Sequence, residues 1–512
     1  MNYKHISLNI LNIVFWFFGG IYVLCGIVSY IYFDVKILTF FSIAGISCLV
    51  LGAIAFSLTP SRLVLRAKDG FIITSVSYVS LGLVGALPFL VLDTGVTNVT
   101  DGVFEAVSGL TTTGSTVLTG LDDMHPAILF YRQVLQWFGG MGIILLVVAI
   151  LPLLGIGGMQ LFKAEASGSA QQNIRPRVRE TAKTLWLFYV GLTIMCAAAY
   201  WIAGMTLFDA ICHSFSTVAL GGFSTHDASI GFFNSVAIEL VCIVFMLFAA
   251  VNFTLHFASW NQFWNSTKTA VHKLFKRNVT SRMIYQAQGG ARAVFRIYFN
   301  DYEFRLFGGL TLALILISCI ELLGYLGLEK FSLGDTIFQS VAFITTAGFS
   351  VTAHGDWPMS VTFLLILFAC AGGCVGSTAG GLKMFRVLII LQQGWREIYR
   401  LLYPNGVFLI KLHKDFVPDR IVDAVWGLFA LYIATLVILI FIVITISDMD
   451  FVTAFSAVAA CLANLGPGLG DVAANYQNVT PAVKWVLVVA MILGRLEIIT
   501  ILILLVPKYW RI

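Results

Sequence analysis

The sequence predicts an all-α polytopic membrane protein, and composition and span length carry that prediction. Of the 512 residues, 59% are hydrophobic and only 11% are charged, and the mean hydropathy is +0.91. A soluble chain cannot bury that much apolar surface. A helix of about 20 apolar residues crosses a hydrocarbon core of about 30 Å. Windows of that length occur at 10–31, 36–57, 71–91, 127–154, 182–203, 232–257, 305–327, 359–391, 423–446 and 482–506.

The basic residues predict how these spans are oriented. The chain has 31 lysines and arginines, and all but five of them gather in a few places. These places are the chain ends, the segment Lys383–Arg386, and four linkers with their flanks, namely 58–70, 155–181, 258–304 and 392–422. Positive residues mark the cytoplasmic side of a membrane protein. We therefore expect a multi-pass protein with both termini in the cytoplasm, and an even number of spans agrees because it places both termini on the same side. The first apolar run lacks a cleavage-site pattern and is expected to be retained.

Four linkers on the opposite side each contain a short apolar segment. Thirteen residues of helix extend about 20 Å at 1.5 Å per residue. Such a helix is too short to span and too apolar to lie in water, which predicts re-entrant helices. The four segments are Asp101–Thr113, Asp209–Gly221, Asp335–Ala347 and Thr453–Leu465.

These segments form a fourfold repeat when they are aligned on one glycine each, namely Gly114, Gly222, Gly348 and Gly466. The glycines are 108, 126 and 118 residues apart, and thirteen residues before each stands an Asp or Thr that is expected to cap the helix N-terminus. Each module is a span, a half-helix, an irregular strand and a span. The predicted boundaries are an N-terminal transmembrane hairpin at 1–58 and pore modules at 59–160, 161–262, 263–395 and 396–512.

Four half-helices that end inside the membrane favour a desolvated cation. Each C-terminus carries about half a negative charge. Irregular backbone at membrane depth is tolerated only where it lines a water-filled path, and glycine permits the turn that aims carbonyls inward. Rings of carbonyls replace the hydration shell of an alkali ion. The alternative is a set of ordinary helix-breaking turns, which four matched copies argue against.

Two further features lie inside predicted spans. The stretch GGCVGSTAGG, Gly372–Gly381, holds five glycines, and each costs a helix about 1 kcal/mol relative to alanine. A non-helical loop is one interpretation; close helix packing is the other, since Gly372, Gly376 and Gly380 have small-xxx-small spacing. Arg495 lies in the last span, where an arginine needs a partner.

The modules resemble the Trk/Ktr/HKT superfamily of cation channels and transporters, most closely its bacterial Trk branch of potassium uptake permeases. The stretches that carry the resemblance are SGLTTTGST, FYRQVLQWFGGMGIILLVVAILPLLGIGGMQL, HSFSTVALGGFSTHDASIG, GGCVGSTAGGLK and ANLGPGLG. Nearly the whole chain is covered, including the N-terminal hairpin. The resemblance implies a pseudo-fourfold pore that takes up potassium across the bacterial inner membrane.

The same resemblance implies which residues bind potassium through their backbone. By position, the filter is Thr112, Thr113, Gly114, Leu220, Gly221, Gly222, Thr346, Ala347, Gly348, Asn464, Leu465 and Gly466. Leu220 and Asn464 depart from the threonine of the other copies, which puts strict fourfold chemistry in question. In the plant branch a serine at the first filter glycine goes with sodium preference, so Gly114 favours potassium.

The resemblance also implies a gate below the filter. The gate is an intramembrane loop that obstructs the pore, with Arg495 beside it donating to loop carbonyls; the alternative is a structural bridge from Arg495 to Glu239 or Glu321. The gate residues are Gly372, Gly373, Gly376, Ser377, Thr378, Gly380, Gly381 and Arg495.

The implied partners are a second copy of the chain, membrane lipid and a cytosolic nucleotide-binding regulator of the TrkA type. This chain has no GxGxxG after a strand and no P-loop, so we expect nucleotide on the regulator and none here. No nucleic-acid partner is expected. Loop 258–304 and the stretch Lys411–Arg420 are the basic surfaces on which a regulator would dock.

Other classes of function fit less well. The sequence has no HExxH, no serine–histidine pairing and no paired carboxylates on one span, so we expect no enzyme. Alternating-access carriers usually pair inverted halves, unlike four tandem modules. A sodium or unselective cation conductor and a proton-coupled potassium symporter stay open as alternatives. Arg132 is interpreted as a surface anchor, and His213 and His256 as hydrogen-bonded packing residues.

Overall fold

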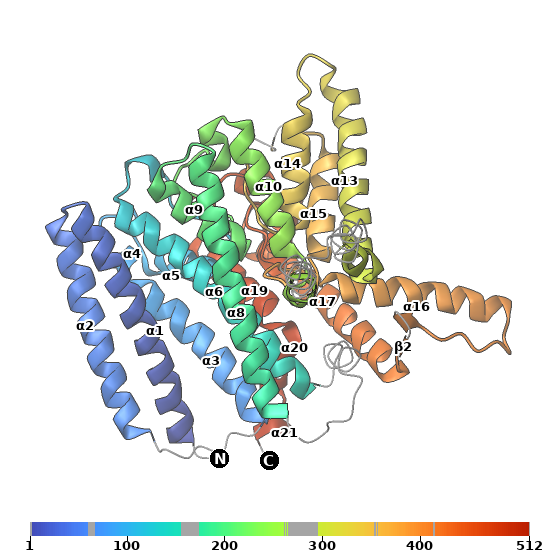
Figure 1. Ribbon diagram of the computed structural model, residues 1–512, viewed down its shortest axis with the longest axis horizontal. Helices are drawn as coiled ribbons and strands as arrows, with labels where there is room; N and C mark the ends of the chain where they lie inside the picture. The colour runs from blue at the N-terminus through green and yellow to red at the C-terminus, as the bar shows by residue number, and fades with distance from the viewer. Residues whose placement is uncertain are drawn as a thin grey trace, which may run out of the picture.

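The computed structural model of the chain is a bundle of tilted helices in which both termini lie at the same end (Figure 1). It describes residues 3–59, 67–154, 174–260, 262, 264, 295–352, 355, 357–412 and 415–510. The predicted basic linkers at 155–181 and 258–304 lie mostly outside the described residues. The expected all-α class is confirmed, apart from one two-residue hairpin, β1 (Lys411–Leu412) with β2 (Asp415–Phe416).

The first two helices form a hairpin at one edge of the bundle (Figure 1). They are α1 (Tyr3–Ile31) and α2 (Val35–Leu58). The side chain of Asp34 caps α2 by accepting from the Ile37 amide at 3.0 Å. The hairpin packs through α1 against α3 (Ala67–Gly85) and α6 (Pro126–Leu154).

The remaining helices repeat the order long helix, short helix, long helix. The first set is α3 with α4 (Leu87–Val91), α5 (Val99–Leu110) and α6; the second is α8 (Ile174–Ile202), α9 (Leu207–Ala219) and α10 (Val236–Ala250). The third is α13 (Tyr302–Leu326), α14 (Leu333–Ile344), α15 (Met359–Ala371) and α16 (Met384–Leu402); the fourth is α17 (Asp419–Ile446), α18 (Phe451–Ala463), α19 (Pro481–Leu496), α20 (Ile498–Leu505) and α21 (Pro507–Trp510). Three 3-10 turns, η1 (Leu121–Asp123), η2 (Ser229–Phe233) and η4 (Gly470–Val472), follow short helices.

Six helices of the described chain are long and apolar enough to cross a membrane, and two bent helix pairs raise the number to eight. Three predicted windows are not continuous helices. The window 232–257 bends by 98° after Ala250, and 482–506 bends by 109° at Glu497. The window 359–391 is interrupted between Ala371 and Met384. Hydropathy alone misses such breaks because the residues around them stay apolar.

The expected caps of the short helices are wrong by three residues. The N-caps are Asn98, Thr206, Ser332 and Asp450. Asp101, a predicted cap, instead stands at the third helical position and bonds the cap twice: its amide donates to the Asn98 side chain and its carboxylate accepts from the Asn98 side-chain amide, both at 2.9 Å. The cap and the residue three positions on are both polar, so the pattern alone did not separate them.

The short helices are the most buried part of the bundle, and most of the residues in the second half of each one are inaccessible to solvent. In α18 every residue from Ser456 to Ala463 is buried, whereas the long helices expose large apolar side chains such as Ile46, Ile320 and Phe441. Apolar side chains that face outward suit contact with lipid, not water. Burial of the short helices positions their C-terminal ends together.

Candidate functional site

The four short helices end in the same unusual conformation. Thr112, Leu220, Thr346 and Asn464 have φ angles of 51°, 54°, 57° and 53°, and all are buried. Non-glycine residues seldom adopt this left-handed conformation, least of all branched ones such as threonine. The departure of Leu220 and Asn464 from threonine therefore leaves the backbone repeat intact, because all four positions turn the chain in the same way.

Immediately after these turns, the aligned glycines make a closed cycle of contacts between modules. Gly114, Gly222, Gly348 and Gly466 all have positive φ. A Cβ on Gly114 would overlap the carbonyl oxygen of Gly221, and one on Gly222 the carbonyl oxygen of Ala347. A Cβ on Gly348 would likewise overlap the carbonyl oxygen of Leu465, and one on Gly466 the carbonyl oxygen of Thr113.

Each module thus contacts the next, and the fourth contacts the first. We call the backbone carbonyls of Thr113, Gly221, Ala347 and Leu465 the carbonyl ring. Four convergent carbonyls at the C-terminal ends of four buried helices provide hard oxygen ligands and partial negative charge. Such an arrangement can bind a desolvated alkali cation.

Side-chain donors make the ring unequal. The Gln136 side chain donates from Nε2 to the Gly221 carbonyl at 2.5 Å and accepts from the Phe223 amide at 3.1 Å. In the fourth module, the carbonyl of Gly466, the residue after the ring member Leu465, accepts from Ser115 Oγ at 2.9 Å and from the Tyr476 hydroxyl at 3.0 Å. Sequence reasoning did not find Gln136, which is distant in the chain from the strand it holds.

A buried ion pair stands behind the ring, and it corrects the interpretation of Arg132 as a surface anchor. Arg132 is 1% exposed, and its Nε donates to Glu105 Oε1 at 2.8 Å. Its guanidinium also donates to the Ser224 carbonyl at 3.1 Å and lies 4.2 Å from the centre of the Phe223 ring. Arg132 therefore ties α5 to the strand of the second module. An acidic residue within a predicted half-helix was the signal that could have found it.

The histidines are packing residues, as expected. His213 in α9 bonds the Asp209 carbonyl through Nδ1 and Ser224 Oγ through Nε2, both at 2.9 Å. His256 bonds the Tyr298 hydroxyl at 2.6 Å and the Phe248 carbonyl at 2.8 Å. Among the described residues, no group of three or more His, Cys, Asp or Glu side chains could hold a metal ion.

Residues 372–383 form a non-helical loop between α15 and α16, so the alternative of close packing within a continuous helix is wrong here. Thr378 Oγ1 donates to the Val218 carbonyl at 2.9 Å. The Gly380 amide donates to Thr346 Oγ1 at 2.7 Å, and the Gly381 amide to the Ala463 carbonyl at 3.0 Å. The loop therefore lies directly against the C-terminal ends of α9, α14 and α18.

Arg495 in α19 bonds this loop. Its guanidinium donates to the Thr378 carbonyl and to the Gly139 carbonyl of α6, both at 3.2 Å. The alternative partners do not meet it among the described contacts: Glu321 accepts from Ser360 Oγ at 3.1 Å, and no ion pair of the described residues joins Arg495 to Glu239. Arg495 therefore links three modules.

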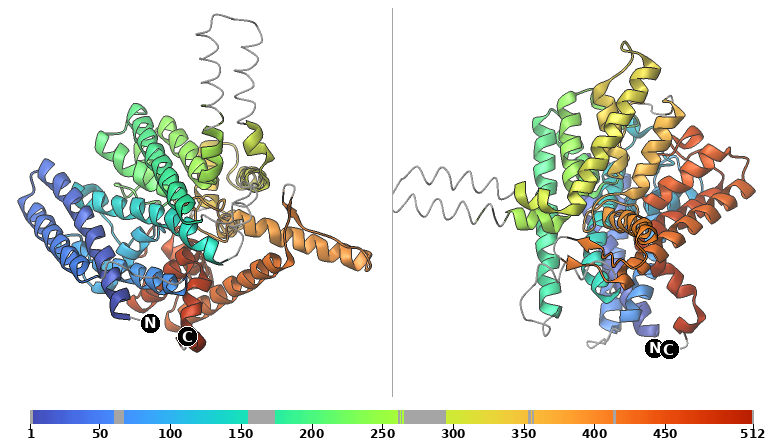
Figure 2. Two further views of the ribbon diagram at one scale, coloured as in Figure 1. Left: turned by 60° about the horizontal axis from the view of Figure 1, so that its bottom comes forward. Right: turned by 90° about the vertical axis from the view of Figure 1, so that its right-hand side faces the viewer.

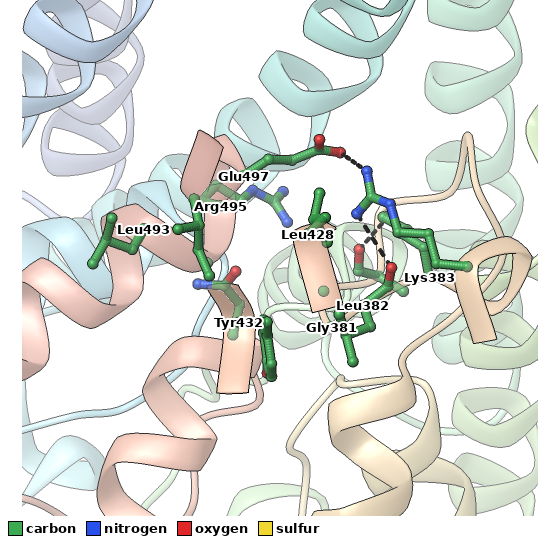
Figure 3. Close-up of a pocket in the computed structure, with 14 residues that line it drawn as sticks. Gly381, Leu382, Lys383, Leu428, Tyr432, Leu493, Arg495 and Glu497 are labelled. Atoms are coloured by element: carbon green, nitrogen blue, oxygen red, sulfur yellow. Dashed lines mark hydrogen bonds and ion pairs between the residues drawn. The ribbon is translucent and has the colours of Figure 1, made fainter. Parts of the chain in front are cut away.

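A pocket lies between the loop and the last helices, and Figure 3 shows its lining side chains. Glu497 accepts from Arg386 at 2.6 Å across the pocket, and Lys383 donates to the Ala379 carbonyl at 2.7 Å. Arg495 also lines it. Three cationic side chains and one carboxylate thus leave this pocket with excess positive charge.

Comparisons with known proteins agree with one another. The family model of TrkH, a cation transport protein, matches residues 36–512. The chain is 48% identical over 450 residues to the Trk system potassium uptake protein TrkH of Vibrio parahaemolyticus, covering 87% of each. It is 42% identical to the TrkH of Escherichia coli K12 over 100% of both chains. The crystal structure of the potassium transporter TrkH from V. parahaemolyticus matches with a TM-score of 0.84 and 43% identity over 100% of both chains.

Proposed function

The chain belongs to the TrkH family of cation transport proteins, and on that premise we propose that it takes up potassium across the bacterial inner membrane through its carbonyl ring. The observation that carries this function is the closed cycle of glycine–carbonyl contacts. In this proposal, the cycle of four modules places the oxygens in a ring around the ion, and oxygens of this kind replace the hydration shell of an alkali ion. The curated relatives are named for potassium uptake.

In this proposal the filter is built from backbone, and its residues are the twelve predicted from the sequence. The left-handed turn that is shared by Thr112, Leu220, Thr346 and Asn464 supports it, because residues with different side chains adopt the same backbone conformation there. Potassium is the transported ion, and no nucleotide is assigned to this chain.

Flux of potassium, rubidium and sodium into proteoliposomes tests the filter. Gly114→Ser should lower the potassium-to-sodium permeability ratio, because a side chain there overlaps the Gly221 carbonyl. Thr112→Ser is the control and should change the ratio less, since it alters no backbone group. If Gly114→Ser leaves the ratio unchanged, Gly114 is not part of the filter.

A second candidate function, an unselective monovalent cation conductor, draws support from the unequal ring. Gln136 occupies one lone pair of the Gly221 carbonyl in the ring, and Ser115 and Tyr476 both donate to the Gly466 carbonyl, which follows the ring member Leu465. Carbonyls held by donors offer a cation less negative charge. Equal fluxes of potassium and sodium through the unaltered chain would favour this candidate.

We further propose that the loop 372–381 with Arg495 is a gate. Its bonds to the ends of three short helices support a position that blocks the exit from the ring. The positive charge of Arg495 and Lys383 beside it opposes a cation that leaves. Withdrawal of the loop would open the path.

The orientation proposed is that both termini are cytoplasmic. The two termini lie at the same end of the bundle (Figures 1 and 2), which supports an even number of crossings. Single cysteines placed near each end should react with a membrane-impermeant thiol reagent only in inverted vesicles. Reaction in intact cells would reverse the orientation.

Two protein partners are proposed, a second copy of the chain and a cytosolic nucleotide-binding regulator of the TrkA type. The relatives are named as parts of a Trk system, which supports association with other components. Helix α16 projects from the bundle (Figure 2) and exposes Trp395, Ile398 and Tyr399, a surface suited to a second copy.

Nucleotide sensitivity tests the regulator. ATP or NADH should leave flux through the isolated chain unchanged and should alter it only after the regulator is added. A response of the isolated chain would place a nucleotide site on this protein.

A further inference from the structure

A buried carboxylate fastens both ends of the loop. Glu303 lies in the first turn of α13 and is 5% exposed. Its Oε1 accepts from the Val375 amide at 2.5 Å and from the Phe385 amide at 3.1 Å. These two amides are ten residues apart in the chain, one near the start of the loop and one just after its end. One oxygen atom therefore closes the base of the loop.

Neither an ion pair nor helix capping accounts for this carboxylate. No ion pair among the described residues includes Glu303. The cap of α13 is Asp301, whose side chain accepts from the Phe304 amide at 2.7 Å. A buried carboxylate is costly unless hydrogen-bond donors surround it, and the donors that Glu303 has are the two loop amides.

The base of the loop is closed within the third module, with a further bond from the Cys374 amide to the Ala250 carbonyl at 2.9 Å, whereas the tip bonds the ends of three short helices. At the base, the Met384 amide donates to the Gly373 carbonyl at 2.9 Å, so Glu303 reinforces a closure that lies within the third module. At the tip, Thr378, Gly380 and Gly381 bond residues of α9, of the strand after α14 and of α18. Tip contacts can part while the base stays closed.

We propose that Glu303 is the positioning residue of the loop, a clamp that fixes its base so that the tip stays against the carbonyl ring. The role in conduction rests on the proposed gate. A buried amide left without an acceptor costs about 1–3 kcal/mol, so one carboxyl oxygen that accepts from both amides favours the closed base. Removing it loosens the base and lowers the occupancy of the blocking position.

The test combines hydrogen exchange of the loop with potassium flux, both on the full chain in lipid without regulator. Glu303→Ala should speed exchange in peptides that contain Val375 and Phe385 by about tenfold or more, and should raise flux severalfold. Glu303→Gln keeps an acceptor and should show smaller increases in both. Glu321→Gln, on the same helix but at the opposite end, is the matched control and should change neither.

Hydrogen exchange tests the clamp, and potassium flux tests the proposed gate, so the two measurements distinguish failure of one from failure of the other. Unchanged exchange in Glu303→Ala overturns the clamp. Faster exchange with unchanged flux upholds the clamp and overturns the gate. If Glu303→Ala does not fold, Glu303→Met, which keeps the bulk of the side chain but has no accepting oxygen, carries the test, and loop exchange equal to that of the unaltered chain overturns the clamp.

Discussion

The carbonyl ring and the loop beneath it are both rich in glycines with positive φ, but they are held in opposite ways. In the ring, each glycine abuts the carbonyl of the next module, and the four contacts close on themselves. In the loop, the glycines belong to one module, and separate hydrogen bonds attach the loop to the end of α14 in its own module and to the second and fourth modules.

The difference teaches which region can move. A closed steric cycle lets no member shift unless its neighbours shift too, since packed interiors resist small displacements. Separate hydrogen bonds contribute about 1 kcal/mol each to stability and can break one at a time. The ring is therefore expected to be rigid, and the loop is expected to have two positions.

The largest effect should come from a side chain placed in the ring. Gly348→Ala would put a Cβ into the Leu465 carbonyl at a φ of 73°, where strain alone is about 1–3 kcal/mol. We expect loss of potassium flux and a lower melting temperature. Gly308→Ala on α13, where a Cβ meets nothing within 4 Å, is the control and should be neutral or slightly stabilising. Normal flux in Gly348→Ala would break the claim that the ring is rigid.

The ion pair behind the ring should matter nearly as much. Arg132→Met leaves the Glu105 carboxylate buried without its partner, a loss of about 3–5 kcal/mol. Thermal unfolding of the purified protein measures it. Arg400→Met breaks an exposed pair with Glu397 and should cost less than about 1 kcal/mol. If Arg132→Met and Arg400→Met unfold at the same temperature, the Arg132–Glu105 ion pair does not stabilise the protein.

A smaller and opposite effect is expected for the loop. Arg495→Ala removes two bonds from the charged guanidinium, each contributing about 1.5–3 kcal/mol. Because about 1.4 kcal/mol is tenfold in an equilibrium, potassium flux without regulator should rise more than tenfold while the fold persists. Flux and melting temperature are measured together, with Arg305→Ala as control. Lost stability without added flux would show that Arg495 holds the fold and not the gate.

The smallest effect concerns the loops outside the ring. His226 bonds Asp122 at 2.5 Å and thereby joins the first two modules. Burial lowers the pKa of His226, but the hydrogen bonds and charges of Asp209 and Asp122 outweigh it, so the pKa is raised above 6.5. This stabilisation is present below about pH 6.5 and is lost as pH rises through the raised pKa.

We expect the melting temperature of the unaltered chain to fall above pH 6.5 and that of His226→Gln to fall less. The difference in the free energy of unfolding should be less than about 1 kcal/mol, because solvent screens the pair. His125→Gln serves as the control. Parallel pH profiles for the unaltered chain and His226→Gln would remove His226 as the link between these loops.

The amino-acid sequence was sufficient to predict the features of this protein that repeat or that depend on composition. Hydropathy located the spans, because contact with lipid requires apolar side chains. Four aligned glycines predicted the ring positions, since each must adopt a positive φ beside a carbonyl. Five glycines in ten residues marked Gly372–Gly381 as unusual for a helix, but they left a non-helical loop and close helix packing as alternatives, and the break between α15 and α16 decided for the loop.

Only the tertiary structure decided which distant groups meet. Gln136 on the Gly221 carbonyl, Arg132 on Glu105 and Glu303 on the loop amides join residues far apart in the chain. The sequence held each of these side chains but not its partner. A buried polar group takes whichever complementary group the packed helices bring within about 3 Å, and that choice is made by the arrangement of the modules around the ring.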